Sequence, residues 1–230
     1  MLRCLQILSS VKLEAGGVAR CAIDLCDGLA QHGVATTLAT AEADDVPEAW
    51  KAAAPPADTP RCVVYDPARP LDTLGPLIAE HDVAHLHVPW DRLNPAVAAA
   101  CDKAHTPYAI SVHGMLDDWS MAQKGLKKRA YWWLTARKLL NHAAFVHTTA
   151  RAEADQAQKW FDHDRVVVAP LLMDPEPFRR TADTDPWPDL TELDLQDQEE
   201  TVSLKRGVGV AAPQAAPHGL PAAPPAPAAP

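Results

Sequence analysis

The sequence has no long apolar run and no paired cysteines, and these two absences narrow the class of protein. No stretch approaches the roughly 18 apolar residues of a membrane-spanning helix. The short apolar run that ends at Leu8 is soon followed by Lys12 and Glu14, so it is also too short for a signal peptide. The five cysteines are scattered and contain no Cys-x-x-Cys pair, which argues against a disulfide framework and a zinc site. We therefore expect a cytoplasmic protein, with peripheral association at the inner face of a membrane as the alternative.

The sequence also lacks an excess of basic residues. Its formal net charge is -9 over 230 residues. From Thr181 onward eight acidic residues stand against two basic ones, so the C-terminal part holds about two thirds of this charge. The preceding part is only weakly acidic, which gives no support to attraction between the whole protein and nucleic acid. We expect no nucleic-acid partner.

The C-terminal part of the chain lacks any apolar periodicity. After Phe178 the sequence passes through an acidic stretch that contains Pro186 and Pro188, and then into an Ala/Pro run over 213–230. Such a composition cannot bury enough apolar surface to offset the entropy of the chain. We therefore expect an ordered domain at 1–178 and a disordered tail at 179–230.

The first 178 residues do contain apolar runs of strand length that alternate with amphipathic helical stretches. The first unit consists of a strand at 2–8, a glycine-containing loop and a helix at 18–31. This alternation predicts an α/β fold, a Rossmann-like parallel sheet flanked by helices. In such sheets ligands bind beyond the carboxyl ends of the strands. The further predicted strands are 35–39, 62–65, 83–87, 108–112, 144–147 and 166–169.

Two adjacent glycines, Gly16 and Gly17, lie between the first predicted strand and the first predicted helix. Glycines at this place let backbone amides approach an anion at the N-terminus of the helix, which suits a phosphate or a sugar acceptor. The dinucleotide-binding pattern G-x-G-x-x-G is absent, because Cys21 and Ala22 follow. A tight turn without a ligand is the alternative interpretation.

Four histidines fall at predicted strand ends: His85, His87, His113 and His147. The first two are two residues apart and share one face of their strand. One interpretation is a metal-dependent hydrolase that uses these strand-end histidines, although a barrel hydrolase needs more strands than this chain supplies. We assign no metal ligand. Packing of the histidines at the edge of the sheet is the simpler alternative.

The most distinctive segment, 107–119, has the sequence PYAISVHGMLDDW. It occurs together with the glycine loop, HVPW at 87–90 and TTARAEA at 148–154. Each of these motifs is weak alone, but their combination in this order closely resembles the N-terminal, acceptor-side domain of family-4 (group 1) retaining glycosyltransferases of the GT-B fold. The resemblance covers residues 1–178.

The resemblance implies a division of labour between two Rossmann-like domains, of which the N-terminal one binds the acceptor and the C-terminal one binds the nucleotide-sugar. Gly16 and Gly17 match the family's loop near the donor diphosphate. His113 matches the histidine that reaches the transferred sugar, so it is the expected catalytic residue. Weaker expectations for donor or acceptor binding fall on His87, Trp90, Asp117 and Glu153.

The family stabilises the departing diphosphate with a Lys/Arg pair and a Glu-x7-Glu motif of the C-terminal domain, and we expect this chain to supply neither. The resemblance ends after 174–178, which is similar to the family's interdomain linker. We therefore expect the acceptor-binding half of a hexosyltransferase of polysaccharide biosynthesis, truncated by a frameshift or premature stop and inactive alone. No cofactor is expected beyond the family's nucleotide-sugar donor. A non-catalytic glycan-binding module is the remaining alternative.

The stretch 121–141 predicts a helix that combines basic residues with the aromatic residues Tyr131, Trp132 and Trp133. This combination suits an anionic membrane surface, where lipid-linked sugar acceptors reside. A solvated charged face over a packed aromatic stripe is the alternative. The basic residues expected to contact such a surface are Lys124, Lys127, Lys128 and Arg129.

Overall fold

The computed structural model describes residues 1–56, 58–123, 125–162 and 164–172. This part of the chain contains a seven-stranded sheet in the order β3-β2-β1-β4-β5-β6-β7, and every neighbouring pair is parallel. The predicted α/β, Rossmann-like fold is therefore confirmed. The boundary predicted at residue 178 and the tail predicted at 179–230 lie outside the described residues.

All seven predicted strands are present, and their ends agree with the prediction to within one residue. The central strands are apolar runs that the structure buries on both faces, as parallel sheets covered by helices require. The strands are β1 (Arg3–Ile7), β2 (Ala35–Thr40), β3 (Arg61–Val64), β4 (Val83–His87), β5 (Tyr108–Ser111), β6 (Phe145–Thr148) and β7 (Val166–Val168).

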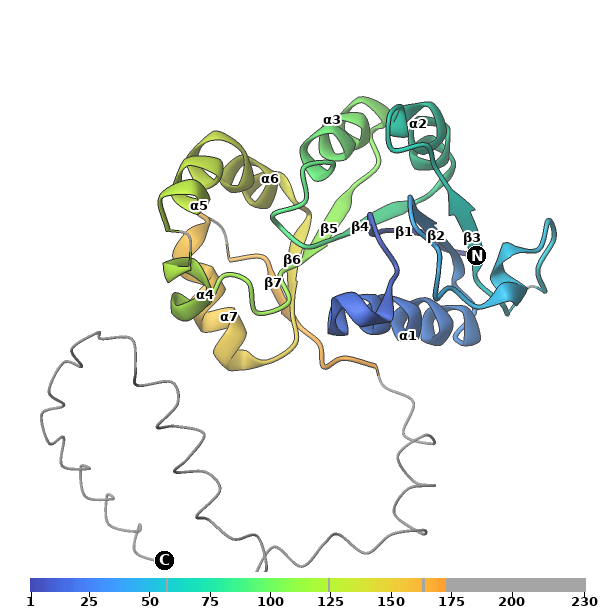
Figure 1. The fold of residues 1–230 in the computed structure, drawn as a ribbon, viewed down its shortest axis with the longest axis horizontal. Helices are drawn as coiled ribbons and strands as arrows, with labels where there is room; N and C mark the ends of the chain where they lie inside the picture. The colour runs from blue at the N-terminus through green and yellow to red at the C-terminus, as the bar shows by residue number, and fades with distance from the viewer. Residues whose placement is uncertain (57, 124, 163, 173–230) are drawn as a thin grey trace, which may run out of the picture. The chain divides into compact units, whose positions relative to one another are not determined.

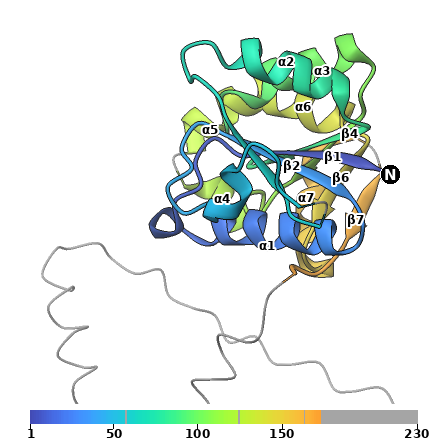
Figure 2. The ribbon, with the colours of Figure 1, turned by 90° about the vertical axis from the view of Figure 1, so that its right-hand side faces the viewer.

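Helices cover both faces of the sheet. The longer ones are α1 (Gly17–Gln31), α2 (Pro70–Glu80), α3 (Asn94–Ala104), α5 (Gly125–Tyr131) and α7 (Arg151–Ala157). The shorter ones are η1 (Leu13–Ala15), η2 (Glu48–Lys51), α4 (Asp118–Ala122), η3 (Trp132–Ala136), α6 (Arg137–His142) and η4 (Gln158–Trp160). In Figures 1 and 2, α2, α3 and α6 lie above the sheet and α1 and α7 lie below it.

Each face of the sheet has its own apolar core. The larger core includes Leu5, Leu86 and Ile110 of the central strands, packed with buried side chains of α2, α3 and α6. The smaller core lies against α1, where Ala22 and Cys26 are completely buried. These two cores hold the strands rigidly, so the loops at the carboxyl edge of the sheet start from fixed positions.

The continuous helix predicted over 121–141 was wrong at its start. The carboxylate of Asp117 accepts a hydrogen bond from the Ser120 backbone nitrogen and so caps a separate short helix, α4. Gln123 is extended, and a helix begins again at Gly125, a residue of low helix propensity. This second helix continues through a π-helical segment, η3, into α6. Across the part of the chain that the structure describes, no helix has the length and apolarity needed to cross a membrane.

Candidate functional site

The carboxyl ends of β4, β5 and β6 bring all four strand-end histidines together. The parallel register places His87 beside Ser111, and Ser111 beside His147. The ring centroids are 4.6 Å apart for His85 and His87, 5.3 Å for His87 and His113, and 5.9 Å for His85 and His147. The histidines predicted from the sequence therefore form one cluster at the ligand-binding edge of the sheet.

A first hydrogen-bond chain joins Gln6, His87 and His113. The side-chain oxygen of Gln6 lies 2.9 Å from His87 Nε2, so this nitrogen donates. His87 Nδ1 is then an acceptor, and His113 Nε2 donates to it across 3.0 Å. The partners thus assign the tautomer of both neutral rings.

A second chain joins His85, Ser111 and His147. His147 Nε2 donates to the backbone oxygen of Ala169 across 2.9 Å. Its Nδ1 therefore accepts from the Ser111 hydroxyl at 2.7 Å, and that hydroxyl accepts from His85 Nε2 at 2.7 Å. His87 and His147 use both ring nitrogens in hydrogen bonds to protein groups, so they leave no nitrogen for a metal.

Burial keeps His85, His87 and His113 uncharged. It lowers the pKa of His85 to about 3 and that of His113 to about 4, and it holds the pKa of His87 well below its usual range. Neighbouring histidines add to this effect, while Glu153 opposes it at His113. Among the described residues, no group of three or more His, Cys, Asp or Glu side chains could hold a metal ion. The interpretation as a metal-dependent hydrolase therefore gains no support here.

Two strained turns end the histidine-bearing strands. Val88 has φ 64° directly after β4, and His113 has φ 49° shortly after β5. Such left-handed conformations are costly for residues other than glycine, and they cluster at functional sites. The buried amide of Asn94 donates to the backbone oxygens of His87 and Val88, at 3.0 and 2.8 Å. These two hydrogen bonds therefore stabilise the unusual backbone at Val88.

Glu153 holds the turn that contains His113. One carboxylate oxygen accepts from the Gly114 backbone nitrogen at 2.5 Å. The other accepts from the Thr149 backbone nitrogen and, at 2.8 Å, from the Thr149 hydroxyl at the start of α7. The structure thus gives Glu153, a predicted binding residue, a positioning role within the domain.

The glycine loop leaves open space before α1. Gly16 has φ 128°, which a side chain rarely tolerates, and it directly precedes the first residue of this 15-residue helix. A Cβ atom added at Gly16 or Gly17 would meet no other atom within 4 Å. The loop therefore exposes the amino end of a long helix, where the backbone N–H groups favour an anion.

A cavity of about 270 Å³ adjoins the histidine cluster. Its walls come from α1, from the ends of the histidine-bearing strands and from the segment after β7. The lining residues are Cys21, Leu25, His87, Ser111, His113, His147, Ala169, Pro170, Leu171 and Leu172. Two of the predicted site residues, His87 and His113, thus face one cavity, and Gly16 and Gly17 are not among its lining residues.

A second pocket of about 410 Å³ lies at the carboxyl ends of β1 to β4. Asp91 and Tyr65 are part of its wall, together with Ser9. The Ser9 hydroxyl donates to Asp91 Oδ2 at 2.5 Å and accepts from the Tyr65 hydroxyl at 3.3 Å. A carboxylate has room for further hydrogen bonds, so this pocket offers acceptors and hydroxyl groups to a polar ligand.

The two remaining predicted site residues lie outside both pockets. Trp90 packs against Tyr131 and Trp132, with ring centroids 5.9 and 6.3 Å apart, and Lys128 Nζ lies 5.4 Å from its ring centroid. Asp117 serves as the N-cap of α4. The structure therefore gives Trp90 and Asp117 contacts that organise the helical segment after β5.

Several polar residues of the site were not predicted. Gln6 interrupts an otherwise apolar strand, and the structure buries it completely. A polar residue inside an apolar run is visible in the sequence and could have indicated a buried hydrogen-bond partner. Asp91 and Asn94 closely follow the strand that ends at His87, yet nothing in their spacing shows that they contact it. The unpredicted residues are Gln6, Ser9, Tyr65, Asp91, Asn94 and Ser111.

The comparisons with known proteins concern the family and the fold of the chain. Residues 16–171 match the family model of the glycosyl transferase 4-like domain. No curated protein matches the sequence. The crystal structure of Anabaena HepE in complex with UDP matches with a TM-score of 0.50 and 14% identity, over 80% of this chain and 50% of that one.

Two further solved structures match less closely. Arabidopsis thaliana UGT89C1 complexed with UDP-L-rhamnose matches with a TM-score of 0.48 and 12% identity, over 80% of this chain and 56% of that chain. UDP-N-acetylglucosamine 2-epimerase from Rickettsia bellii matches with a TM-score of 0.46 and 13% identity, over 87% of this chain and 51% of that chain. This chain spans about half the length of the solved structures that it matches.

The matched region begins at Gly16 and contains the histidine cluster, the His113–Gly114 turn and Glu153. It spans about two thirds of the sequence, and it confirms the resemblance inferred from the motifs. The chain belongs to the family of glycosyl transferase 4-like domains.

Proposed function

We propose that this chain is the acceptor-side domain of a glycosyltransferase that moves a hexose from a nucleotide-sugar to a glycan or lipid-linked acceptor. The observation that supports this most is the arrangement around the carboxyl end of β4. His87 lines the cavity that contains His113, and Asp91, four residues later, lines the second polar pocket. A transferase needs two such neighbouring places, one facing the donor sugar and one holding the acceptor.

In this proposal His113 faces the transferred sugar. Its Nε2 donates to His87, so Nδ1 keeps a lone pair that can accept a hydrogen bond from a sugar hydroxyl. Because burial lowers its pKa to about 4, the ring stays neutral at pH 7. The open amino end of α1 at Gly16 and Gly17 faces the donor diphosphate, since helix N-termini favour negative charge.

The acceptor occupies the pocket of Ser9, Tyr65 and Asp91. A saccharide presents many hydroxyl groups, and the Asp91 carboxylate accepts hydrogen bonds from them more strongly than a neutral oxygen does. The tyrosine and serine hydroxyls both donate and accept. This combination suits a polyhydroxylated acceptor.

We also propose that the chain alone transfers no sugar. A departing nucleoside diphosphate needs cationic groups where its charge develops. Burial keeps His85, His87 and His113 neutral at pH 7, and in the family the cationic groups belong to the donor-binding domain. A donor-binding half must therefore be supplied in trans for transfer to occur.

A glycan array probed with the purified full-length chain tests acceptor binding. We expect binding to at least one saccharide class, with affinity reduced about tenfold or more in Asp91→Asn, because a charge-assisted hydrogen bond is lost. Asp66→Asn is the matched control, since the Asp66 carboxylate is exposed and accepts from the nearby Ala68 nitrogen. The proposal fails if no saccharide is bound, or if both variants weaken binding equally.

Measurement of nucleotide release tests the claim of inactivity. The full-length chain is incubated with UDP-, GDP- and dTDP-hexoses, with and without the saccharides that it binds. We expect no nucleoside diphosphate above the enzyme-free background. Release or transfer above that background would overturn the claim.

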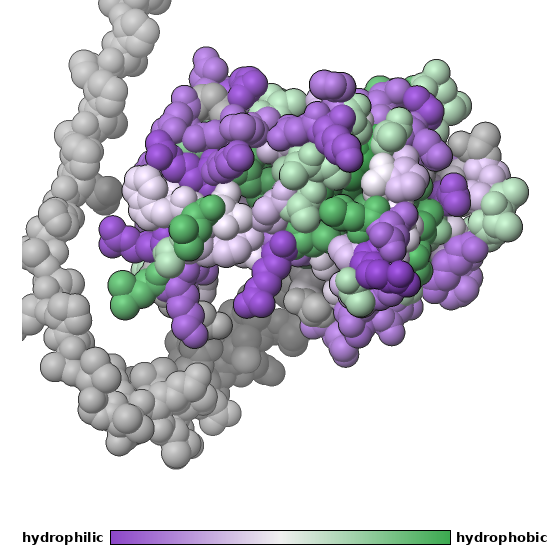
Figure 3. Space-filling view, turned by 90° about the horizontal axis from the view of Figure 1, so that it is seen from above, coloured by the Kyte–Doolittle hydropathy of each residue, from purple (hydrophilic) through white to green (hydrophobic). Residues whose placement is uncertain are grey.

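A specific surface feature also favours peripheral membrane association, and with it a location at the cytoplasmic face. Large apolar side chains are exposed around α4, α5 and η3, and apolar residues project over α5 in Figure 3. Their exposed fractions are 75% for Trp119, 87% for Leu126, 67% for Trp133 and 82% for Leu134. Lys127 and Arg129 are exposed beside them. Amphipathic surfaces of this kind bind anionic lipid.

Two of the predicted membrane-contacting lysines give no support to this proposal. Lys128 donates to the backbone oxygen and hydroxyl of Ser120, so the fold already uses its ammonium group. Lys124 lies outside the described residues. The proposed membrane contact therefore rests on Lys127, Arg129 and the exposed apolar side chains.

Cosedimentation with anionic vesicles tests this association. We expect binding at low salt that weakens as salt is added, and weaker binding by the double variant Leu126→Gln, Leu134→Gln. Leu13→Gln is the control, because Leu13 is exposed in η1, far along the chain from these residues. Absence of binding at low salt would remove the membrane proposal and leave the glycosyltransferase proposal intact.

A further inference from the structure

A third cavity, of about 560 Å³, lies among the helices that follow β5 and β6. Its walls come from α4, from the continuous helix of α5, η3 and α6, and from the segment around η4. It shares no lining residue with the two pockets at the carboxyl edge. The lining residues are Asp118, Met121, Ala122, Arg129, Trp132, Trp133, Arg137, Lys159, Trp160 and Asp162.

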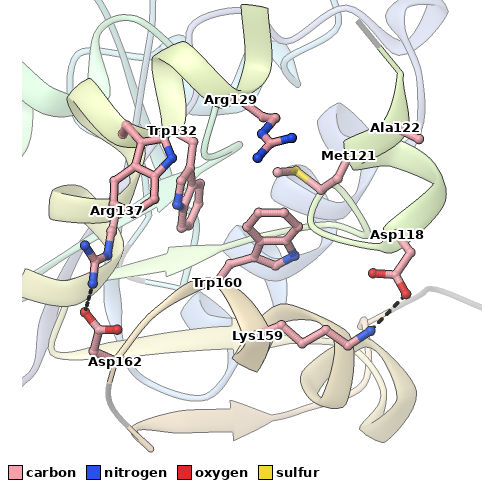
Figure 4. A pocket seen from close by; sticks show the side chains of 10 residues that line it. Asp118, Met121, Ala122, Arg129, Trp132, Arg137, Lys159, Trp160 and Asp162 are labelled. Atoms are coloured by element: carbon pink, nitrogen blue, oxygen red, sulfur yellow. Dashed lines mark hydrogen bonds and ion pairs between the residues drawn. The ribbon is translucent and has the colours of Figure 1, made fainter. Parts of the chain in front are cut away.

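Aromatic rings form much of this wall. Trp132 and Trp160 pack edge to face with centroids 5.4 Å apart, and Trp133 stands beside them under the Arg137 guanidinium at 5.1 Å. Figure 4 shows the Trp160 indole in the middle of the cavity, with Met121 and Arg129 opposite. Indole faces carry negative potential and attract the C–H groups of a pyranose ring. The wall therefore suits a sugar ring.

The indole N–H of Trp160 is buried and has no hydrogen-bond partner among the described residues. In Figure 4 this nitrogen is turned toward the side of the cavity where Met121 and Asp118 lie. Buried donors in proteins are nearly always paired. Because this nitrogen is closed off from solvent, a ligand oxygen in the cavity would reach it after a small movement of the indole.

The charges around the cavity leave one cation available. Lys159 pairs with Asp118 at 2.9 Å, and Arg137 pairs with Asp162 at 2.7 Å. Arg129 has no ion pair or hydrogen bond within the part of the chain that the structure describes. Its guanidinium points into the cavity in Figure 4. A planar guanidinium matches the oxygens of a phosphate, so the cavity favours a ligand with one anionic group.

The backbone also distinguishes this region. Trp132 and Trp133 begin the π-helical segment η3, which interrupts an otherwise regular helix. In this segment Trp132 is buried while the adjacent Trp133 is exposed, and both line the cavity. Short π-helical segments are rare, and they occur frequently at functional sites.

We infer that this cavity is a binding site for a phosphorylated hexose, either free or as the head of a lipid-linked saccharide. The sugar ring packs on Trp160, a ring oxygen or hydroxyl accepts from the Trp160 indole, and the phosphate pairs with Arg129. The choice of a saccharide as ligand rests on the proposed function. The site itself is separate, so it offers the domain a second contact with a glycan substrate or product.

An NMR titration of the ¹⁵N-labelled full-length chain tests this inference, with the indole N–H signal of Trp160 assigned through Trp160→Phe. The probes are α-D-glucose 1-phosphate, methyl α-D-glucopyranoside and inorganic phosphate. We expect saturable shifts of the Trp160 and Trp132 indole signals, with glucose 1-phosphate at least about tenfold tighter than either other probe. Arg129→Gln should lower this affinity about tenfold, whereas Arg151→Gln, on the exposed surface of α7, should leave it unchanged.

The other outcomes contradict the inference. Equal affinity for glucose 1-phosphate and inorganic phosphate, or for glucose 1-phosphate and the uncharged glucoside, would remove the phosphorylated hexose as ligand. Shifts caused only by vesicles of phosphatidic acid would assign the cavity to a lipid headgroup without a sugar. No shift with any probe, or no effect of Arg129→Gln, would overturn the site.

The backbone signal of Gly114 separates this inference from the proposed function. Gly114 belongs to the turn at the carboxyl edge, and it is not among the residues that line the third cavity. If the Trp160 signal shifts while no glycan binds at the carboxyl edge, the proposed function fails and the third site stands. The reverse result removes the third site alone.

Discussion

At the scale of single residues, the site depends on histidines that the fold holds neutral. His85, His87 and His113 are buried, and each has a pKa below its ordinary value. In the unfolded chain a histidine titrates near pH 6.5. As the pH falls below that value, the unfolded chain therefore binds protons that the folded domain does not, and the folded state loses stability relative to it.

The first prediction follows from this difference. The free energy of unfolding should fall as the pH is lowered from about 6.5 toward about 4, by about 1.4 kcal/mol per pH unit for each of the three histidines. Above about pH 7 these residues should contribute no pH dependence. Urea unfolding of the full-length chain at a series of pH values measures the slope.

One variant makes this prediction specific. His85→Gln keeps a donor for Ser111 and should reduce the slope by about one histidine's share. Equal slopes for His85→Gln and the wild type would show that burial of His85 does not drive the effect.

The second prediction concerns Glu153, whose carboxylate bonds Gly114 and Thr149. In Glu153→Gln one side-chain oxygen is replaced by an amide donor, which leaves at least one backbone N–H without an acceptor. We expect the free energy of unfolding to drop by about 1–3 kcal/mol. Asp155→Asn, on the exposed side of the same helix, should change it by less than about 0.5 kcal/mol. Similar losses in both variants would contradict the positioning role of Glu153.

At the scale of elements, the sequence allowed the strands to be predicted better than the helical segment after β5. Each strand is a short apolar run bounded by polar or turn residues. Such a run can be identified from the sequence without knowing which distant residues pack against it. The break between α4 and α5 depends on the Asp117 cap and on Gly125, which compete locally with an otherwise helical pattern. The apolar periodicity of the sequence does not reveal this competition between a local cap and a continuous helix.

The candidate site shows the same contrast. The histidines could be predicted because each follows its own strand, and parallel strands end at one edge. Their partners could not, because Gln6 lies 81 residues from His87 and Glu153 lies 39 residues from Gly114. These contacts depend on strand order and on the path of the loops. Asp91 and Trp160 were missed for the same reason.

The third prediction tests the glycine loop at the start of α1. Gly16→Ala places a side chain at φ 128°, so we expect a loss of about 1–3 kcal/mol in the free energy of unfolding. Gly17→Ala lies in the first turn of the helix, where a Cβ has open space, and should be neutral or stabilising by up to about 1 kcal/mol. Thermal or urea unfolding compares the two. Equal effects would contradict the backbone conformation at Gly16.

At the scale of the whole molecule, the described residues form one Rossmann-like domain of the glycosyl transferase 4-like family. Its carboxyl edge presents a histidine cluster, an open helix N-terminus and a pocket with a carboxylate. We propose that these groups recognise hydroxyls and hold a sugar in place. We therefore propose that this domain recognises a saccharide and that it does not transfer a sugar alone.

The measurement that tests this account most directly is a titration of the ¹⁵N-labelled full-length chain with the saccharides that it binds, and separately with UDP. We predict that a saccharide causes saturable shifts of the backbone signals of Gly114 and Asp91, and that UDP alone binds at least about tenfold more weakly. Shifts confined to residues away from the carboxyl edge, or binding of UDP in preference to every saccharide, would contradict an acceptor-side domain.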